Sequence, residues 1–284
     1  MTKGEISVKI RYLGTAAAEG WPALFCSCPI CTHAREQGGK NLRTRTQAII
    51  DNELLMDFPP DTYCHALQYG LELAKIHTLL VTHSHMDHWF PTDLIHRHEH
   101  FGHGAAGTLA VYGNQAVKDV FDSHILIDRF KPHPIDHVVN FHVTHGGDHI
   151  QSNGWNIIAV PADHDQREEC LVYICKKDAK TFFYGHDTGR NLSPEAWALI
   201  TAERYDLVSL DATMGRKAVP GYHMGLPDAE STFQKLTESG CIDRHTVKVV
   251  NHFSHNGEMT HDEIAAWGRE RGIIAAYDGM EIAF

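Results

Sequence analysis

A short apolar strand that runs straight into a cluster of metal-binding side chains constrains this chain more than any other feature. The strand is predicted at residues 77–82, and the side chains that follow it are His83, His85, Asp87 and His88. His83 and His85 are two positions apart, so an extended backbone points both to the same side. Buried polar groups need partners of their own, which makes such a cluster costly as ordinary core packing. We therefore predict a metal site at the end of this strand.

The cluster also indicates which ions the site accepts. Imidazole suits zinc, iron and manganese, and the carboxylate of Asp87 adds negative charge that helps to hold a second divalent ion. The chain contains 23 histidines in 284 residues. Most of them are expected on the surface or as satisfied core residues, so position and spacing must identify the ligands. The identity of the metals stays open among manganese, zinc and iron.

The rest of the chain alternates runs of strands with helices. Further strands are predicted at 7–13, 46–50, 53–57, 108–112, 138–143, 155–161, 170–175, 181–184, 207–210 and 247–250. Helices are predicted at 61–73, 114–121, 193–201, 227–239 and 261–269. The strands 46–50 and 53–57 are predicted to form a hairpin that turns at Asp51-Asn52. The chain is predicted to close on a strand pair, 273–277 and 281–283, that turns at Asp278-Gly279.

No linker or low-complexity segment interrupts this pattern. We therefore expect a single domain over residues 1–284 of the α/β (α+β) class. Strands clustered in runs with helices between them predict two sheets packed face to face and covered by helices. The expected architecture is a four-layer αββα sandwich.

The order His-x-His-x-Asp-His after an apolar strand resembles the signature of the metallo-β-lactamase superfamily. The resemblance implies an αββα sandwich with a two-metal site at one sheet edge. One metal is then held by the first two histidines and a later one, the other by the Asp-His pair and a further histidine, and a single aspartate bridges them. Positions at three later strand ends match this pattern, namely His164, Asp187 as the bridge, and His252.

Several neighbouring histidines are not expected to be ligands. His186 adjoins Asp187 and is expected to point to the opposite side, behind the ligands. His142, His145 and His149 lie in a turn-rich segment without the arrangement of a strand followed by a ligand.

Three of the seven cysteines, Cys26, Cys28 and Cys31, form the pattern Cys-x-Cys-x-x-Cys. Zinc in a closed structural site takes four tetrahedral sulfur or nitrogen ligands, so a fourth ligand is required. A redox pair is the competing interpretation, but such a pair normally opens a helix after a strand in a βαβ unit, which is not predicted here. The odd number of cysteines also does not suggest a disulfide framework. The pattern predicts a zinc-binding loop at about 20–35.

The segment from Gly14 to Cys31 resembles a branch of the superfamily, the phosphoribosyl 1,2-cyclic phosphate phosphodiesterases of the carbon–phosphorus lyase pathway. This resemblance implies that a histidine three residues after the last catalytic ligand completes the zinc site, and that position is His255. The zinc would tie the N-terminal loop to the loop of His252 and position that ligand. The branch also has a later histidine that acts as an acid near the leaving oxygen, and the matching position is His223.

The resemblance implies a dinuclear metal-dependent hydrolase, in the first place a phosphodiesterase for a small cyclic phosphate or a nucleotide-like diester. A metal-bridging hydroxide would attack phosphorus in line, and His223 would protonate the departing alkoxide. Asp87 and His223 are the predicted catalytic residues. Arg190 and Arg216 are candidate phosphate contacts.

Three alternatives stay open. A transfer-RNA 3′-end endonuclease shares the histidine motif but is not expected to carry the cysteine loop. A lactone or carboxylic-ester hydrolase can use the same metal-activated water. A non-catalytic metal-binding protein of cofactor biosynthesis can carry the cysteine loop, but such relatives tend to have an eroded catalytic site, whereas all seven ligand positions are filled here.

Composition narrows the partners and the location. The formal net charge of −11 provides no overall basic surface, so a small-molecule substrate is expected rather than bulk nucleic acid. No stretch has the apolar length to cross a bilayer, and residues 1–5 carry no apolar signal region, so we expect a cytoplasmic protein with no membrane partner. The family resemblance suggests a homodimer. A His-rich insert at about 90–104 is not part of the family pattern and leaves the substrate open.

Overall fold

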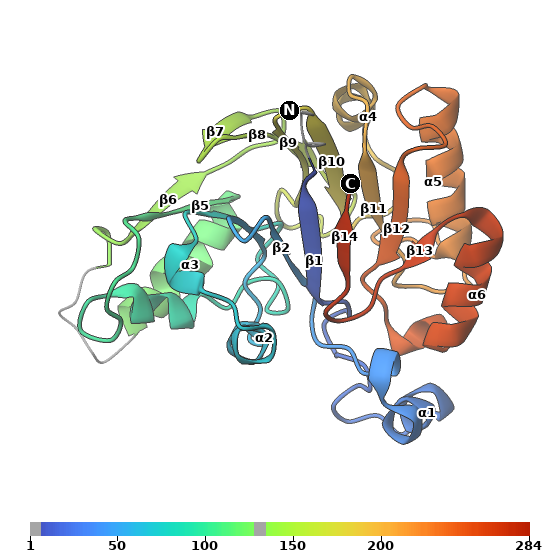
Figure 1. Cartoon of the computed structure of the whole chain (residues 1–284), viewed down its shortest axis with the longest axis horizontal. Helices are drawn as coiled ribbons and strands as arrows, with labels where there is room; N and C mark the ends of the chain where they lie inside the picture. The colour runs from blue at the N-terminus through green and yellow to red at the C-terminus, as the bar shows by residue number, and fades with distance from the viewer. Residues whose placement is uncertain (1–6, 128–134) are drawn as a thin grey trace, which may run out of the picture.

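Two seven-stranded sheets pack face to face within the described residues, 7–127 and 135–284, and helices lie on their outer faces (Figure 1). The computed structural model therefore confirms the predicted αββα sandwich. The expectation about residues 1–5 lies outside the described residues. None of the helices in the described ranges has the length and apolar character needed to span a membrane.

The first sheet has the strand order β14-β1-β2-β3-β4-β5-β6. Its strands are β1 (Lys9–Gly14), β2 (Gln47–Ile50), β3 (Leu54–Met56), β4 (Thr78–Leu80), β5 (Leu109–Gly113), β6 (Val139–Val143) and β14 (Glu281–Ala283). The strands from β3 to β6 are parallel, so their carboxyl ends share one edge of the sheet. Two helices lie on the outer side of this sheet, α2 (Thr62–Tyr69) and α3 (Gln115–Ile127).

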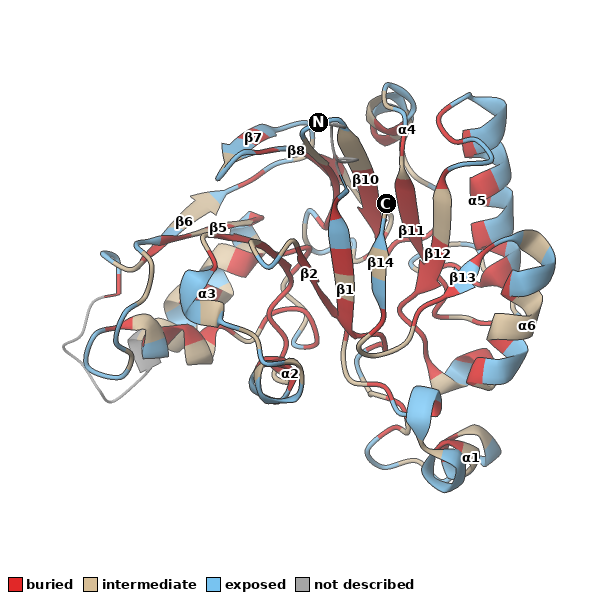
Figure 2. Cartoon of the chain, in the orientation of Figure 1, coloured by how far each residue is buried: buried red, intermediate tan, exposed pale blue. Residues whose placement is uncertain are grey.

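The second sheet has the order β13-β12-β11-β10-β9-β8-β7. Its strands are β7 (His149–Ser152), β8 (Trp155–Pro161), β9 (Leu171–Lys177), β10 (Lys180–Gly185), β11 (Leu207–Asp211), β12 (Val247–Asn251) and β13 (Ile274–Ala275). The helices α4 (Pro194–Thr201), α5 (Leu226–Glu238) and α6 (His261–Arg271) accompany its parallel half. All five residues of β11 are buried, as expected for a parallel strand that is covered on both faces (Figure 2).

The period of two along the strands separates two apolar cores. Met56 and Leu80 belong to the large core between the sheets. Their neighbours Leu55 and Leu79 belong to a second core on the outer face of the first sheet. Adjacent residues of one strand thus pack on opposite faces of the sheet.

The predicted hairpin between β2 and β3 is confirmed, with antiparallel pairing of Ala48 to Met56 and of Ile50 to Leu54. Asp51 and Asn52 have φ angles of 51° and 55°. Two successive left-handed residues are the requirement of a type I′ turn, and Asp and Asn tolerate this conformation best after glycine.

The predicted closing strand pair is wrong. β13 pairs in parallel with β12 in the second sheet, whereas β14 pairs antiparallel with β1 in the first sheet. The segment between them crosses from one sheet to the other, and Asp278 anchors it by accepting hydrogen bonds from Thr15 Oγ1 and Thr44 N, each at 2.6 Å. The turn at Asp278-Gly279 therefore belongs to a connection between the two sheets and not to a hairpin.

Two further differences have local causes. The helix predicted at 61–73 ends at Tyr69 because Gly70 adopts the left-handed conformation, and its N–H bonds the carbonyl of Ala66. A helix in the cysteine segment was not predicted, yet α1 (Pro29–Gln37) begins there. Short 3-10 helices are η1 (Gly39–Asn41), η2 (Leu73–Lys75), η3 (Pro91–Arg97) and η4 (His255–Gly257).

Candidate metal centre

The histidine motif leaves β4 as an extended segment and then closes into a tight turn. His88 N and Trp89 N both donate to the carbonyl of His85, at 3.0 and 2.8 Å. The turn redirects the chain between His85 and His88, so Asp87 and His88 face a point beside the one that His83 and His85 face. The backbone thereby produces two neighbouring ligand groups from one short run of sequence.

The seven predicted metal ligands converge in two groups that share one carboxylate. In each group the ligand atoms lie within 4.8 Å of one another. The first group consists of His83, His85, His164 and Asp187. The second group consists of Asp87, His88, Asp187 and His252. The structure thus brings together the residues that the sequence pattern selected and sorts them around Asp187 as the shared member.

The chemistry of these atoms fits divalent cations. His83 Nε2 is buried and has no hydrogen-bond partner within the described residues, although Asp187 Oδ2 lies 3.3 Å away. His88 Nε2 lies 3.0 Å from the same oxygen and 3.3 Å from His252 Nε2. Ring nitrogens that face one another and a carboxylate in a buried site are expensive without a cation between them. The residues therefore suit two metal ions.

Burial and neighbouring charges determine the ionisation of the ligand side chains. Burial alone would raise the pKa of Asp187, but His252, His164 and His223 hold it well below its usual range. Burial would lower the pKa of His88, yet the carboxylates of Asp87 and Asp57 raise it well above the usual value. For His83, burial and the neighbouring His88 lower the pKa to about 4, so its ring is neutral and can offer a lone pair.

Two histidines of the motif after β4, His85 and His88, each have a carboxylate beside one ring nitrogen. Asp57 Oδ2 lies 2.9 Å from His88 Nδ1, and Asp165 Oδ2 lies 3.0 Å from His85 Nε2. Such partners fix the tautomer and the orientation of a metal-binding imidazole. Both aspartates were missed in the sequence analysis. Asp57 follows β3, the parallel neighbour of β4, so its position at a shared sheet edge was the available signal.

Asp211 is the third residue that the sequence analysis missed, and it supports the two ligands Asp187 and His252. It is fully buried at the end of β11, and it accepts hydrogen bonds from Asp187 N at 3.1 Å and Met224 N at 2.9 Å. It also accepts from Thr213 Oγ1 at 3.0 Å, and that hydroxyl lies 2.7 Å from His252 Nδ1. Asp187 and His252 have φ angles of 57° and 61°. Asp211 therefore stabilises a backbone conformation that few residues adopt freely.

His223 lies against the shared carboxylate at the solvent edge of the site. Its Nδ1 is 2.8 Å from Asp187 Oδ1 and 3.5 Å from Asp211 Oδ2, and its side chain is 28% exposed. Burial would lower the pKa of His223, but Asp187 and Asp211 raise it to about 11. The structure thus places this histidine beside the ligand groups, as a cation with access to the exterior.

The cysteine cluster converges with the predicted histidine from the far end of the chain. The ligand atoms of Cys26, Cys28, Cys31 and His255 lie within 4.8 Å of one another. His255 Nδ1 is 3.4 Å from Cys28 Sγ. Burial opposes ionisation of Cys28, but hydrogen bonds from Cys31 N–H and His255 lower its pKa to about 6. A low thiol pKa and three sulfurs around one imidazole fit a closed zinc site.

Cys28 and Cys31 lie at the start of a helix, α1, and a position at a helix start is one feature expected of a redox cysteine pair. Cys28 is its N-cap, and its Sγ accepts from Cys31 N. However, an irregular segment rather than a strand precedes α1, and no disulfide links any two of the described cysteines. His255 instead supplies the fourth ligand-type group that a metal requires.

His186 was not expected to be a ligand, and it belongs to neither ligand group: its Nε2 lies 2.7 Å from Ser209 Oγ. The two candidate phosphate contacts, in contrast, have other partners. Arg190 lies 3.2 Å from a carboxylate oxygen of Asp228, and Arg216 lies 3.3 Å from Glu263. Both arginines are thus engaged by carboxylates outside the two ligand groups, so the structure gives no support to their role as phosphate contacts.

We expect Asp57→Asn to lower the affinity of the metal pair about 10- to 100-fold. Asparagine tolerates the left-handed conformation of this position, where φ is 61°, so the change removes the charge that faces His88 with little backbone cost. Competition with a fluorescent chelator measures the affinity. Asp119→Asn, on the exposed face of α3, is the matched control. Equal affinities for the two variants would contradict the role of Asp57.

We expect elemental analysis to find about three metal ions per chain, one of them zinc in the cysteine cluster. Cys28→Ser should remove that zinc and leave the other two, because it takes one of four ligands from a closed site. The exposed Cys64 lies outside the cluster, so Cys64→Ser should leave the metal content unchanged. A Cys28→Ser protein that keeps its full zinc content would refute the assignment.

Comparison with known proteins identifies the family of this chain. A family model described as the beta-lactamase superfamily domain matches residues 55–253, whereas no curated protein matches the chain by sequence. Similar solved structures include a diphosphatase from the PhnP family, with 23% identity over 98% of both chains and a TM-score of 0.74.

Two more distant structures share the fold. Zn²⁺-bound PqqB from Methylobacterium extorquens has 16% identity, covers 96% of this chain and 99% of its own, and has a TM-score of 0.66. The short form of human tRNase Z has 17% identity, covers 96% of this chain and 98% of its own, and has a TM-score of 0.65. These likenesses concern the fold, while the family match covers most of the sequence. The chain belongs to the metallo-β-lactamase superfamily of metal-dependent hydrolases.

Proposed function

We propose that this protein is a phosphodiesterase that hydrolyses a small cyclic phosphate or a nucleotide-like diester. The observation that carries the proposal is the pair of ligand groups that share Asp187, with His223 Nδ1 2.8 Å from Oδ1 of that carboxylate. Two-metal sites of this kind suit displacement at phosphorus, because charge develops on both the attacking and the leaving oxygen.

Three side chains would have separate roles in such a reaction. Asp87 and Asp187 place negative charge on the metal pair, which when bound would activate a water and neutralise charge on the phosphate oxygens. Asp187 Oδ1 holds the imidazole of His223 through Nδ1, which leaves the other ring nitrogen for a substrate. His223 is therefore positioned to donate a proton to a leaving alkoxide.

Two further observations support a small phosphodiester over the alternatives. The solved structure of a PhnP-family diphosphatase is similar over 98% of both chains, and that name suggests phosphate chemistry for this fold variant. The formal net charge of −11 disfavours a long nucleic acid, whose binding depends on many basic contacts. A lactone or carboxylic ester needs the same activated water, so a direct comparison of substrates must decide between them.

The proposal predicts that the metal-loaded protein hydrolyses bis(p-nitrophenyl) phosphate faster than p-nitrophenyl phosphate or a simple lactone. A diester presents one negative charge to the metals, whereas a monoester presents about two and a lactone presents none. A panel of ribose cyclic phosphates then tests the substrate class. The Asp187→Ala protein is the blank, because it lacks the shared ligand. Lactone turnover without diesterase activity would reject the proposal.

Replacement of His223 by glutamine should reduce kcat according to the leaving group. For an alkyl leaving group, which needs a proton, we expect a loss of about 10²- to 10⁴-fold. For a p-nitrophenyl leaving group, which departs as a stable anion, the loss should be much smaller. Elemental analysis should show unchanged metal content. His245→Gln, at an exposed position, is the control. An equal loss for both leaving groups would show that His223 does not act as the acid.

A further inference from the structure

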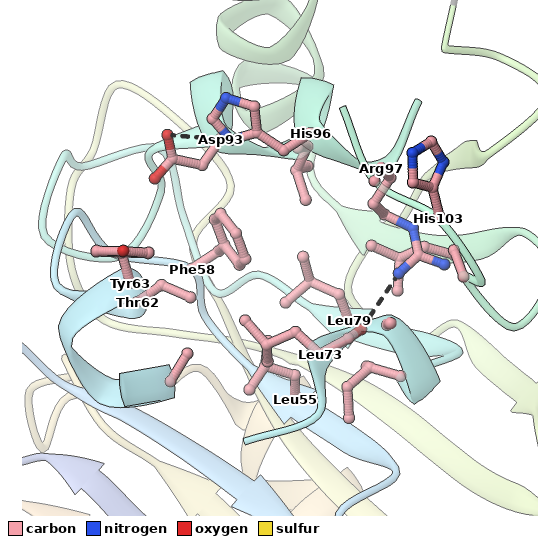
Figure 3. Close-up of a pocket in the computed structure, with 17 residues that line it drawn as sticks. Leu55, Phe58, Thr62, Tyr63, Leu73, Leu79, Asp93, His96, Arg97 and His103 are labelled. Carbon is pink, nitrogen blue, oxygen red and sulfur yellow. Dashed lines mark hydrogen bonds and ion pairs between the residues drawn. The ribbon is translucent and has the colours of Figure 1, made fainter. Parts of the chain in front are cut away.

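A second cavity lies on the outer face of the first sheet, apart from the metal centre. It has a volume of about 550 Å³ between α2, the floor of the sheet and the segment from η3 to Ala105. Figure 3 shows the side chains of Leu55, Leu79 and Phe58 on its floor, with Asp93, His96 and Arg97 on the wall that the insert provides. The His-rich insert that departs from the family pattern therefore closes this cavity.

The cavity is distinct from the reaction site. Leu55 and Leu79 face outward on β3 and β4, whereas their neighbours Met56 and Leu80 face the core between the sheets. None of the seven proposed metal ligands lines the cavity. Its contact with the centre is indirect, because Phe58 N donates to the carbonyl of His88 at 2.7 Å. A ligand here would thus lie behind the metal-binding loop and not in it.

The lining is mostly apolar, and it includes the guanidinium of Arg97, which has no counterion among the described residues. The guanidinium of Arg97 donates to the carbonyls of Leu73 at 3.3 Å and Gly107 at 3.0 Å. Its Nε is buried without a hydrogen-bond partner, and no carboxylate of the described residues forms an ion pair with it. The carboxylate that does line the cavity, Asp93, lies beside His96 instead, at 4.0 Å. A partly buried cation without a counterion is costly, so an anion would relieve this cost.

We propose that this cavity binds a small carboxylic acid with an apolar body. The carboxylate would face Arg97, and the apolar part would lie on Leu55, Leu79 and Phe58. The volume falls within the range of about 300–1,000 Å³ that is typical of small-molecule sites, which are mostly apolar with a few placed polar groups. The proposal does not depend on the reaction that the metal centre performs.

Calorimetric titration of the metal-loaded protein with decanoate, kept below its micelle-forming concentration, tests the proposal. We expect saturable binding of one molecule per chain, and much weaker binding of the decyltrimethylammonium cation, which has the same chain and the opposite charge. Arg97→Gln should weaken decanoate binding at least about tenfold, whereas Arg97→Lys should retain most of it. Arg269→Gln, at an exposed position of α6, should have no effect. Equal binding of the anion and the cation would overturn the proposal.

Bound metals also attract carboxylates, so a second pair of variants tests whether decanoate binds in the cavity or at the metal centre. Ala66 lines the cavity from α2, whereas the adjacent Leu67 is 68% exposed and does not. Ala66→Trp should fill the cavity and abolish decanoate binding, and Leu67→Trp should leave it unchanged. Inorganic phosphate, a ligand for the metal centre, should not displace decanoate. Displacement by phosphate, or full binding by a folded Ala66→Trp protein, would place decanoate elsewhere and reject the site.

Discussion

The buried carboxylate of Asp187 is the interaction on which the arrangement of the site depends. It belongs to both ligand groups, and its oxygens lie within 3.6 Å of ring nitrogens from His83, His88 and His252. A carboxylate in this position is stable only because several imidazoles surround it and because Asp211 holds its backbone N–H. The ligands come from both sheets. The histidine motif follows β4 of the first sheet, whereas His164, Asp187 and His252 follow β8, β10 and β12 of the second sheet.

A second polar cluster connects the beginning and the end of the chain. Cys26, Cys28 and Cys31 reach His255, which follows the proposed ligand His252 by one short turn. Glu19 reinforces this connection, because its carboxylate accepts a hydrogen bond from Ser254 and lies 3.5 Å from His255 Nε2. The N-terminal loop thus lies against the loop that carries His252, in line with the tie between these two loops that the family resemblance implied. The insert, in contrast, builds its own cavity on the outer face of the first sheet.

The parts of the site that follow a simple strand-end pattern were predictable, and the parts that depend on packing were not. His83 to His88 sit in a local run, and His164, Asp187 and His252 each follow an apolar strand. Asp57, Asp165 and Asp211 carry no motif of their own, because their importance arises from distances of 2.9 to 3.1 Å across the fold. The closing strands were assigned to one hairpin because the turn at Asp278 is local, whereas its anchors Thr15 and Thr44 are more than 200 residues away.

The sequence by itself determined the fold class and the ligand types, because periodicity and spacing are properties of neighbouring residues. The pairing of the cysteine motif with His255 was implied by the resemblance to a family and not by local spacing. Tertiary structure decided that Asp57 and Asp165 lie beside ring nitrogens of His88 and His85. It also decided that His223 lies beside Asp187 and that Arg190 and Arg216 pair with other carboxylates. It also decided that Arg97 lines an apolar cavity without a counterion among the described residues. These features depend on side chains from separate elements meeting at one point, and only the packed sheets and helices specify those distances.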